Sequence, residues 1–231
     1  MGSRDSLRVG LTGGIGTGKS TALEEFRRLG AGTLSLDEMS HELSRKGNVL
    51  HRSIVRAFGR RCLDSSGELD RGALARRVFC DPRARRRLER ATHPTLLREM
   101  RRGLARLRQP VVVVDAPLLF EAGIERYFDV TMTISAPASA ATKRLTARRR
   151  ARYRAQHRAQ GVTPLARRAM SRREALLRRR AQWPLERKEA LSDIVLRNDS
   201  SLTRFRRAVR EYHRALFLVA QGSRTARKSP A

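Results

Sequence analysis

Short apolar runs alternate with longer amphipathic stretches along most of this chain. Between the runs, stretches such as Lys19–Leu29 carry apolar residues at helical spacing. A regular alternation of strands and helices predicts an α/β fold, a three-layer, doubly wound parallel sheet. The runs that are typical of buried strands are Leu7–Leu11, Gly32–Leu36, Val111–Val114, Val130–Ser135 and Asp193–Leu196.

The region from Asp37 to Leu107 has a helical pattern throughout and is too long for one crossover helix, so we expect a helical insertion over residues 37–107. Pro82 and Pro94 are predicted to start helices within it. The core of the fold is then expected to comprise residues 1–36, 108–140 and 191–221. A last helix is predicted over Leu202–Leu218, and residues 222–231 are expected to form a flexible tail.

A glycine-rich segment, LTGGIGTGKST, follows the first predicted strand and precedes the first predicted helix. It matches the phosphate-loop pattern G-x-x-x-x-G-K-[ST], in which glycines let backbone N–H groups point at phosphate oxygens and the helix adds its positive end. Lys19 is expected to reach the β- and γ-phosphates, and the Ser20 hydroxyl to bind Mg²⁺. The residues predicted to bind a nucleoside triphosphate are Gly14, Ile15, Gly16, Thr17, Gly18, Lys19, Ser20 and Thr21.

Two aspartates follow predicted strands, at the edge of a parallel sheet where ligands bind. Asp37 can accept a proton from an acceptor hydroxyl or hold Mg²⁺ through water, and as an alternative it can cap the next helix. Asp115 ends a run of four valines that resembles a Walker B strand. This position predicts contact of Asp115 with Mg²⁺ through water.

The charge is strongly unbalanced, at +29 from 51 basic and 22 acidic residues, and 46 of the basic residues are arginine. Such a surface indicates either a polyanionic partner or an arginine-rich genome. Residues 141–190 alone hold 17 basic residues and three glutamates, and we expect them to form an arginine-rich lid. The two cysteines form no disulfide framework and no apolar run is long enough to span a bilayer, so we expect a cytoplasmic protein.

Seven further motifs follow the phosphate loop and the strand that ends in Asp37. They are FG-x₄-D-x₂-G-x-LDR (Phe58–Arg71), VF (Val78–Phe79), THP (Thr92–Pro94), DAPLLFE (Asp115–Glu121), RL-x₂-R (Arg144–Arg148), AQ (Ala181–Gln182) and SDIVLRN (Ser192–Asn198). Through these motifs the chain resembles the dephospho-CoA kinase family from Leu7 to Leu216. The resemblance implies a kinase that transfers the γ-phosphate of ATP to the ribose 3′-hydroxyl of dephospho-CoA, giving CoA in the last step of its synthesis.

The resemblance also implies roles for individual residues. Asp37 falls on the family's catalytic aspartate, and Arg144 and Arg148 fall on lid arginines that clamp the transferring phosphoryl group. Asn198 falls on an adenine-loop residue. The acceptor-side positions are His93, Pro117, Leu118 and Leu119.

For several of these residues a structural role is an alternative. His93 precedes a proline and suits a helix start, the leucines suit packing, and Arg144 and Arg148 suit a solvated helix face.

Two departures from the family pattern stand out. Ser35 replaces the first carboxylate of the usual Asp-x-Asp, and the stretch from Arg148 to Gln182 is much longer than in the family.

ATP and dephospho-CoA are the partners that we expect, with Mg²⁺ as cofactor, no membrane and a monomer or weak homo-oligomer. One alternative is a phosphate-loop kinase for another nucleoside or nucleotide acceptor. A second is a basic nucleic-acid-binding protein that carries the same loop, with nucleic acid otherwise a secondary partner.

Overall fold

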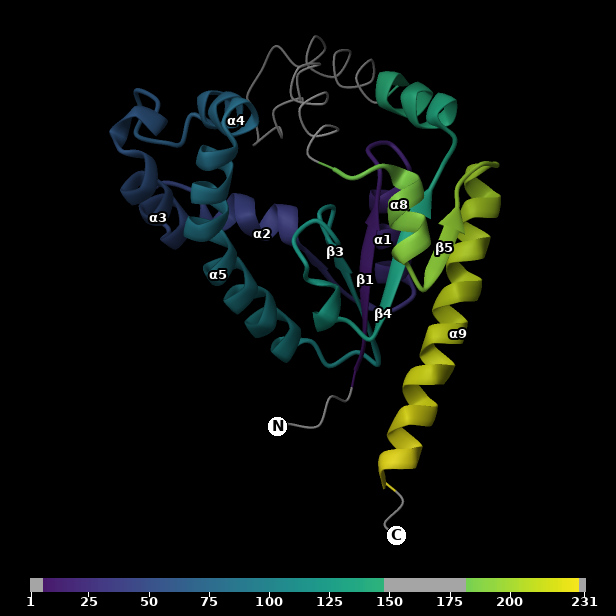
Figure 1. The fold of residues 1–231 in the computed structure, drawn as a ribbon. Coiled ribbons are helices and arrows are strands. Elements are labelled where there is room, and N and C mark those ends of the chain that lie inside the picture. The colour runs from purple at the N-terminus through teal and green to yellow at the C-terminus, as the bar shows by residue number, and fades with distance from the viewer. Residues whose placement is uncertain (1–5, 148–181, 229–231) are drawn as a thin grey trace, which may run out of the picture.

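Five parallel strands form a single sheet in the order β2-β3-β1-β4-β5 in this computed structural model, which describes residues 6–147 and 182–228 (Figure 1). The predicted α/β fold is confirmed. The strands are β1 (Leu7–Gly13), β2 (Gly32–Ser35), β3 (Val111–Asp115), β4 (Val130–Ser135) and β5 (Ile194–Arg197). Asp115, at the end of β3, is in register with Leu11 on one side and with Ser35 on the other.

Both faces of the sheet are buried, and successive valines of β3 point to opposite sides. Val111 and Val113 pack with Phe26 of α1 (Lys19–Arg28) and with Phe205 of α9 (Leu202–Lys228). On the other face, Val112 and Val114 pack with Met100 and Leu104 of α5 (Pro82–Arg106). In Figure 1, α1 lies behind the strands and α8 (Leu185–Leu191) lies in front of them.

The residues between β2 and β3 are helical, as predicted, and have a small core of their own around Leu50, Ile54 and Phe58. Pro82 occupies the first turn of α5, as predicted. Pro94 starts no helix, and that prediction is wrong because Pro94 lies inside α5. The elements are α2 (Leu36–Leu43), α3 (Val49–Phe58), the 3₁₀ turn η1 (Arg60–Cys62), α4 (Arg71–Cys80) and α5.

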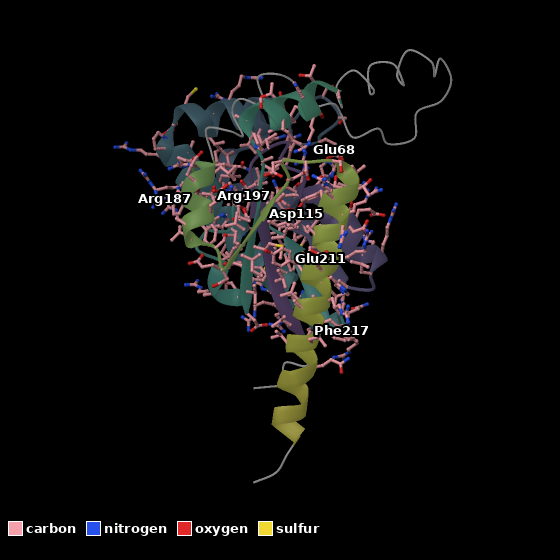
Figure 2. All side chains as sticks on the ribbon, turned by 90° about the vertical axis from the view of Figure 1, so that its right-hand side faces the viewer. Glu68, Asp115, Arg187, Arg197, Glu211 and Phe217 are labelled. Carbon is pink, nitrogen blue, oxygen red and sulfur yellow. The ribbon has the colours of Figure 1, made fainter. Side chains whose placement is uncertain are left out.

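The final helix is longer than its apolar pattern predicts. We expected a flexible tail from Gly222, but α9 continues to Lys228 and extends past the sheet (Figure 1). Figure 2 faces this helix and labels its exposed Glu211 and half-buried Phe217. The continuation is physically simple, because arginine and alanine favour helix and a single glycine costs only about 1 kcal/mol.

The predicted arginine-rich lid falls mostly outside the described residues. Within them, residues 138–147 form a helix at one end of this region and α8 lies at the other. A second 3₁₀ turn, η2 (Glu125–Tyr127), precedes β4. Among the described helices, none combines the length and apolar character that a membrane span requires.

Candidate active site

The glycine-rich segment forms a tight loop between β1 and α1, as its pattern predicts. Gly16 and Gly18 have φ angles of 82° and 110°, values that residues other than glycine rarely adopt. A Cβ atom on Gly18 would lie 2.3 Å from Nδ2 of Asn198, and one on Gly16 would lie 2.6 Å from the carbonyl oxygen of Ala141. The loop therefore requires glycine both for its backbone conformation and for space.

Lys19, the first residue of α1, folds back over the loop. Its Nζ donates hydrogen bonds to the carbonyl oxygens of Gly13 at 2.7 Å and Gly14 at 3.0 Å. Burial lowers the pKa of the Lys19 ammonium, while the charges of Asp115 and Asp37 raise it. An anionic ligand beside this ammonium would favour its charged form, as the two carboxylates do.

Asn198, the residue directly after β5, holds the glycine-rich loop in place. Asn198 is 4% exposed, and its Nδ2 donates a 2.8 Å hydrogen bond to the carbonyl of Thr17. Arg144, on the helix of residues 138–147, donates to the Asn198 Oδ1 at 2.9 Å and to its backbone carbonyl at 3.0 Å. The Asn198 side chain thus bonds to protein through both its ends, so it positions the loop. Arg148 lies outside the described residues.

Asp115 combines burial with charged neighbours. Burial raises its pKa to about 6, the charges of Asp37 and Glu38 also raise it, and the Lys19 ammonium opposes them. Its Oδ1 is buried and has no hydrogen-bond partner among the described residues. A buried carboxylate oxygen without a hydrogen-bond donor is unusual, and it indicates that a bound ligand supplies the missing partner.

These residues fit a magnesium ion that is held chiefly by a bound polyphosphate. Ser20 lies exposed in the first turn of α1, and Asp115 supplies the unpartnered oxygen. The described residues contain no group of three or more histidine, cysteine, aspartate or glutamate side chains that could bind a metal ion by themselves. Mg²⁺ typically binds through one or two protein oxygens, water and substrate phosphates, and Ser20 and Asp115 can supply the protein part of such a set.

Asp37 lies in the first turn of α2, two residues past the end of β2. The cap of this helix is Ser35, whose hydroxyl accepts a 3.3 Å hydrogen bond from the N–H of Glu38. The alternative that Asp37 itself caps the helix is therefore wrong. Asp37 is exposed, and its charge acts on both Lys19 and Asp115. Ser35, which replaces a family carboxylate, keeps the capping role that either side chain can fill.

The four residues predicted on the acceptor side lie in different environments. Leu118 is 43% exposed, whereas Leu119 is fully buried in the core cluster beside β3, so its environment is that of a packing residue. The Pro117 carbonyl accepts hydrogen bonds from Thr12 Oγ1 at 3.3 Å and from Lys188 Nζ at 2.7 Å. His93 is half-buried within α5.

Two charged residues near this site were missed from sequence. Lys188 of α8 is fully buried and pairs with Glu121, at 2.8 Å between Nζ and Oε1, and both charges act on Lys19. Sequence alone treats a charged residue as solvated. One signal was available, because Lys188 is one of only five lysines in a chain with 46 arginines.

Comparison with known proteins gives a consistent result. A family model described as dephospho-CoA kinase matches residues 7–163. A dephospho-CoA kinase from Syntrophotalea carbinolica is 36% identical over 203 residues, which cover 87% of each chain. One from Geobacter sulfurreducens is 36% identical over 208 residues, or 88% of this chain and 95% of that one. Among solved structures, TT1252 from Thermus thermophilus superposes with a TM-score of 0.70 at 33% identity, covering 90% of this chain and 96% of that one.

Proposed function

The chain belongs to the dephospho-CoA kinase family, whose enzymes carry out ATP-dependent phosphoryl transfer in the last step of CoA biosynthesis, and we propose which of its residues perform that reaction. The phosphate loop binds ATP, Asp37 accepts the proton of the ribose 3′-hydroxyl of dephospho-CoA, and Lys19 and Arg144 stabilise the transferring phosphoryl group. The observation that carries this proposal is the Lys19 ammonium, which bonds to the carbonyls of Gly13 and Gly14 at the glycine loop and on which the charges of Asp115 and Asp37 act.

ATP binding exchanges the present contacts of Lys19 for phosphate contacts. Its ammonium now bonds to two loop carbonyls, so it already lies beside the backbone that cradles the phosphates. Backbone N–H groups of the loop and the N-terminus of α1 supply further donors to the phosphates. The residues in this role are Gly14, Ile15, Gly16, Thr17, Gly18, Lys19, Ser20 and Thr21, with Asn198 holding the loop in place.

Ser20 and, through water, Asp115 would hold Mg²⁺ beside the bound ATP. When bound, the ion offsets negative charge on the phosphate oxygens as the bond to the leaving group lengthens. The unpartnered Oδ1 of Asp115 supports this role, because it lacks a donor among the described residues.

Asp37 suits the role of base better than Asp115 does. It is exposed at the start of α2, where an acceptor has access, whereas Asp115 is half-buried at the end of β3 and its Oδ1 is fully buried. As the 3′-oxygen attacks the γ-phosphorus, Asp37 takes the hydroxyl proton, a new phosphate ester forms and ADP leaves. His93, Pro117 and Leu118 are the proposed acceptor contacts.

Arg144 is the described arginine best placed to meet the transferring group. Its Nη2 bonds to Asn198, while its Nη1 is buried and has no hydrogen-bond partner among the described residues. A guanidinium that is held in place by hydrogen bonds from one nitrogen and has no partner at another is pre-organised to bind a phosphate oxygen. Arg148 keeps the same predicted role.

The test is ATP consumption with and without dephospho-CoA, with the product identified as CoA. We expect turnover that requires dephospho-CoA and that adenosine or a nucleoside monophosphate does not replace. Equal turnover with those acceptors would instead indicate another kinase of this fold. Measurements at two salt concentrations separate out the nucleic-acid alternative, which predicts salt-sensitive DNA or RNA binding without acceptor-dependent turnover.

A further inference from the structure

Lys188 is a fully buried lysine whose ammonium bonds only to protein groups among the described residues. Its Nζ lies 2.8 Å from Oε1 of Glu121 and donates a 2.7 Å hydrogen bond to the carbonyl of Pro117. Burial lowers its pKa, and Glu121 opposes that effect. A buried ion pair adds little to the free energy of unfolding, because removing both charges from water is costly. The presence of this pair therefore points to a functional role.

The pair joins three parts of the chain that surround the phosphate loop. Lys188 belongs to α8, and Pro117 and Glu121 belong to the loop that follows β3. The Pro117 carbonyl also accepts from Thr12, which precedes the glycine loop, at 3.3 Å. Glu121 Oε1 accepts a 2.7 Å hydrogen bond from the N–H of Trp183, just before α8. Lys188 therefore fixes the Pro117 carbonyl against both α8 and the end of β1.

The charges of this pair also influence the phosphate site. The Lys188 charge lowers the pKa of Lys19 and the Glu121 charge raises it. The second carboxylate oxygen of Glu121, Oε2, is buried and has no hydrogen-bond partner among the described residues. The pair is therefore close enough for its charges to act on Lys19, and the loop that it holds follows directly after Asp115.

We propose that Lys188 is a positioning residue that holds the segment 116–119, through Glu121 and the Pro117 carbonyl, so that the bound acceptor faces the γ-phosphate. This inference rests on the proposed function and adds to it a residue that does not touch either substrate. Lys188 acts on the acceptor side, because the phosphate loop has a separate brace in Asn198 and Arg144.

The separate brace gives the proposal a distinctive kinetic signature. Lys188→Met removes the charge and both hydrogen bonds while keeping a long, unbranched side chain. We expect KM for dephospho-CoA to rise at least ~10-fold, the scale of a lost positioning contact, and KM for ATP to stay within ~2-fold. The matched control is Glu186→Gln, an exposed charge on the same helix, which leaves both constants unchanged.

The double variant Lys188→Met/Glu121→Gln distinguishes positioning from a merely structural role. Lys188→Met alone leaves Glu121 buried without its cation and lowers Tm, and the double variant removes that charge and recovers Tm. KM for dephospho-CoA stays raised in the double variant, because the Pro117 carbonyl is still released. Glu121→Gln alone, which keeps an oxygen for the Trp183 N–H, provides a folded variant if Lys188→Met does not fold.

Two results would overturn the inference. One is a parallel rise of KM for ATP and for dephospho-CoA in Lys188→Met, and the other is a return of KM for dephospho-CoA together with Tm in the double variant. Failure of the proposed function has a different signature, since the unmodified enzyme would then show no turnover that depends on dephospho-CoA, and both proposals would fall.

Discussion

The side-chain amide of Asn198 donates a 2.8 Å hydrogen bond to the carbonyl of Thr17 in the middle of the phosphate loop. Asn198 follows β5, the last strand in the chain, and the loop follows β1, the first, so the bond joins segments 181 residues apart in the sequence. Arg144 fixes the other end of the same amide. The conformation of the loop therefore depends on a residue that the loop motif does not contain.

Asn198→Ala weakens ATP binding and leaves dephospho-CoA binding unchanged. The change leaves the Thr17 carbonyl and Arg144 without their partner, a loss of about 1–3 kcal/mol, which corresponds to roughly 5- to 150-fold in ATP affinity if the loop alone bears it. Asn198→Asp keeps an oxygen for Arg144 but cannot donate to Thr17, so we expect a similar loss. Normal ATP affinity in Asn198→Asp, measured by titration with a fluorescent ATP analogue, would show that the Thr17 bond is dispensable.

Gly18→Ala and Gly30→Ala form a matched pair of glycine substitutions. Both glycines have positive φ angles, 110° and 88°, but only at Gly18 would the new methyl group meet a neighbour, at 2.3 Å from Asn198 Nδ2. We expect Gly30→Ala to lower the free energy of unfolding by about 1 kcal/mol without an effect on ATP binding. Gly18→Ala weakens ATP binding at least as much as Asn198→Ala does, because Asn198 must move and the backbone at this φ is strained for alanine. Equal effects of the two changes on ATP affinity would contradict this account of the loop.

Asp115→Asn is expected to change the free energy of unfolding in a pH-dependent way and to reduce CoA formation. The pKa of Asp115 rises from 3.8 to about 6 on folding. The folded protein therefore binds more protons than the unfolded chain between these pH values, so the stability associated with this group falls as pH rises from about 4 to about 6. Above pH 7 the loss reaches at most about 3 kcal/mol.

Without nucleotide, Asp115→Asn is therefore more stable than the unmodified protein in urea at pH 8, and the difference shrinks toward pH 4. We nevertheless expect its CoA formation to be reduced, because the carboxylate proposed to hold Mg²⁺ through water is lost. A stability difference that does not change with pH would show that Asp115 has an ordinary pKa in the folded protein.

The parts of the fold that sequence predicted are those set by local patterns. Four consecutive valines before Asp115 indicate a strand buried on both faces, and GGIGTGKS after a strand indicates a phosphate loop. The interior Pro94 and the extension of α9 to Lys228 were mispredicted, because packing and length outweigh one residue's preference. Pro94 lacks an N–H for the helix, yet α5 packs against both the sheet and the other helices of the insertion.

The parts of the site that sequence could not predict are contacts between distant segments. Arg144 and Asn198 belong to family motifs, but the hydrogen bonds that Arg144 donates to Asn198 depend on the order of the strands in the sheet. Lys188 and Glu121 lie far apart in the sequence and look like solvated charges in a chain with 73 charged residues. Their burial against Pro117 is a product of tertiary packing and leaves no periodic signal.

The most direct test of the account is the rate of CoA formation by Asp37→Asn under saturating ATP and dephospho-CoA. The substitution keeps the size of the side chain and removes its ability to take a proton. We predict a rate at least ~100-fold below that of the unmodified enzyme, the low end for loss of a general base, with ATP affinity little changed. Glu42→Gln, which changes an exposed carboxylate on the same helix, keeps the full rate. A normal rate in Asp37→Asn would contradict the assignment of the proton acceptor on which the proposed reaction depends.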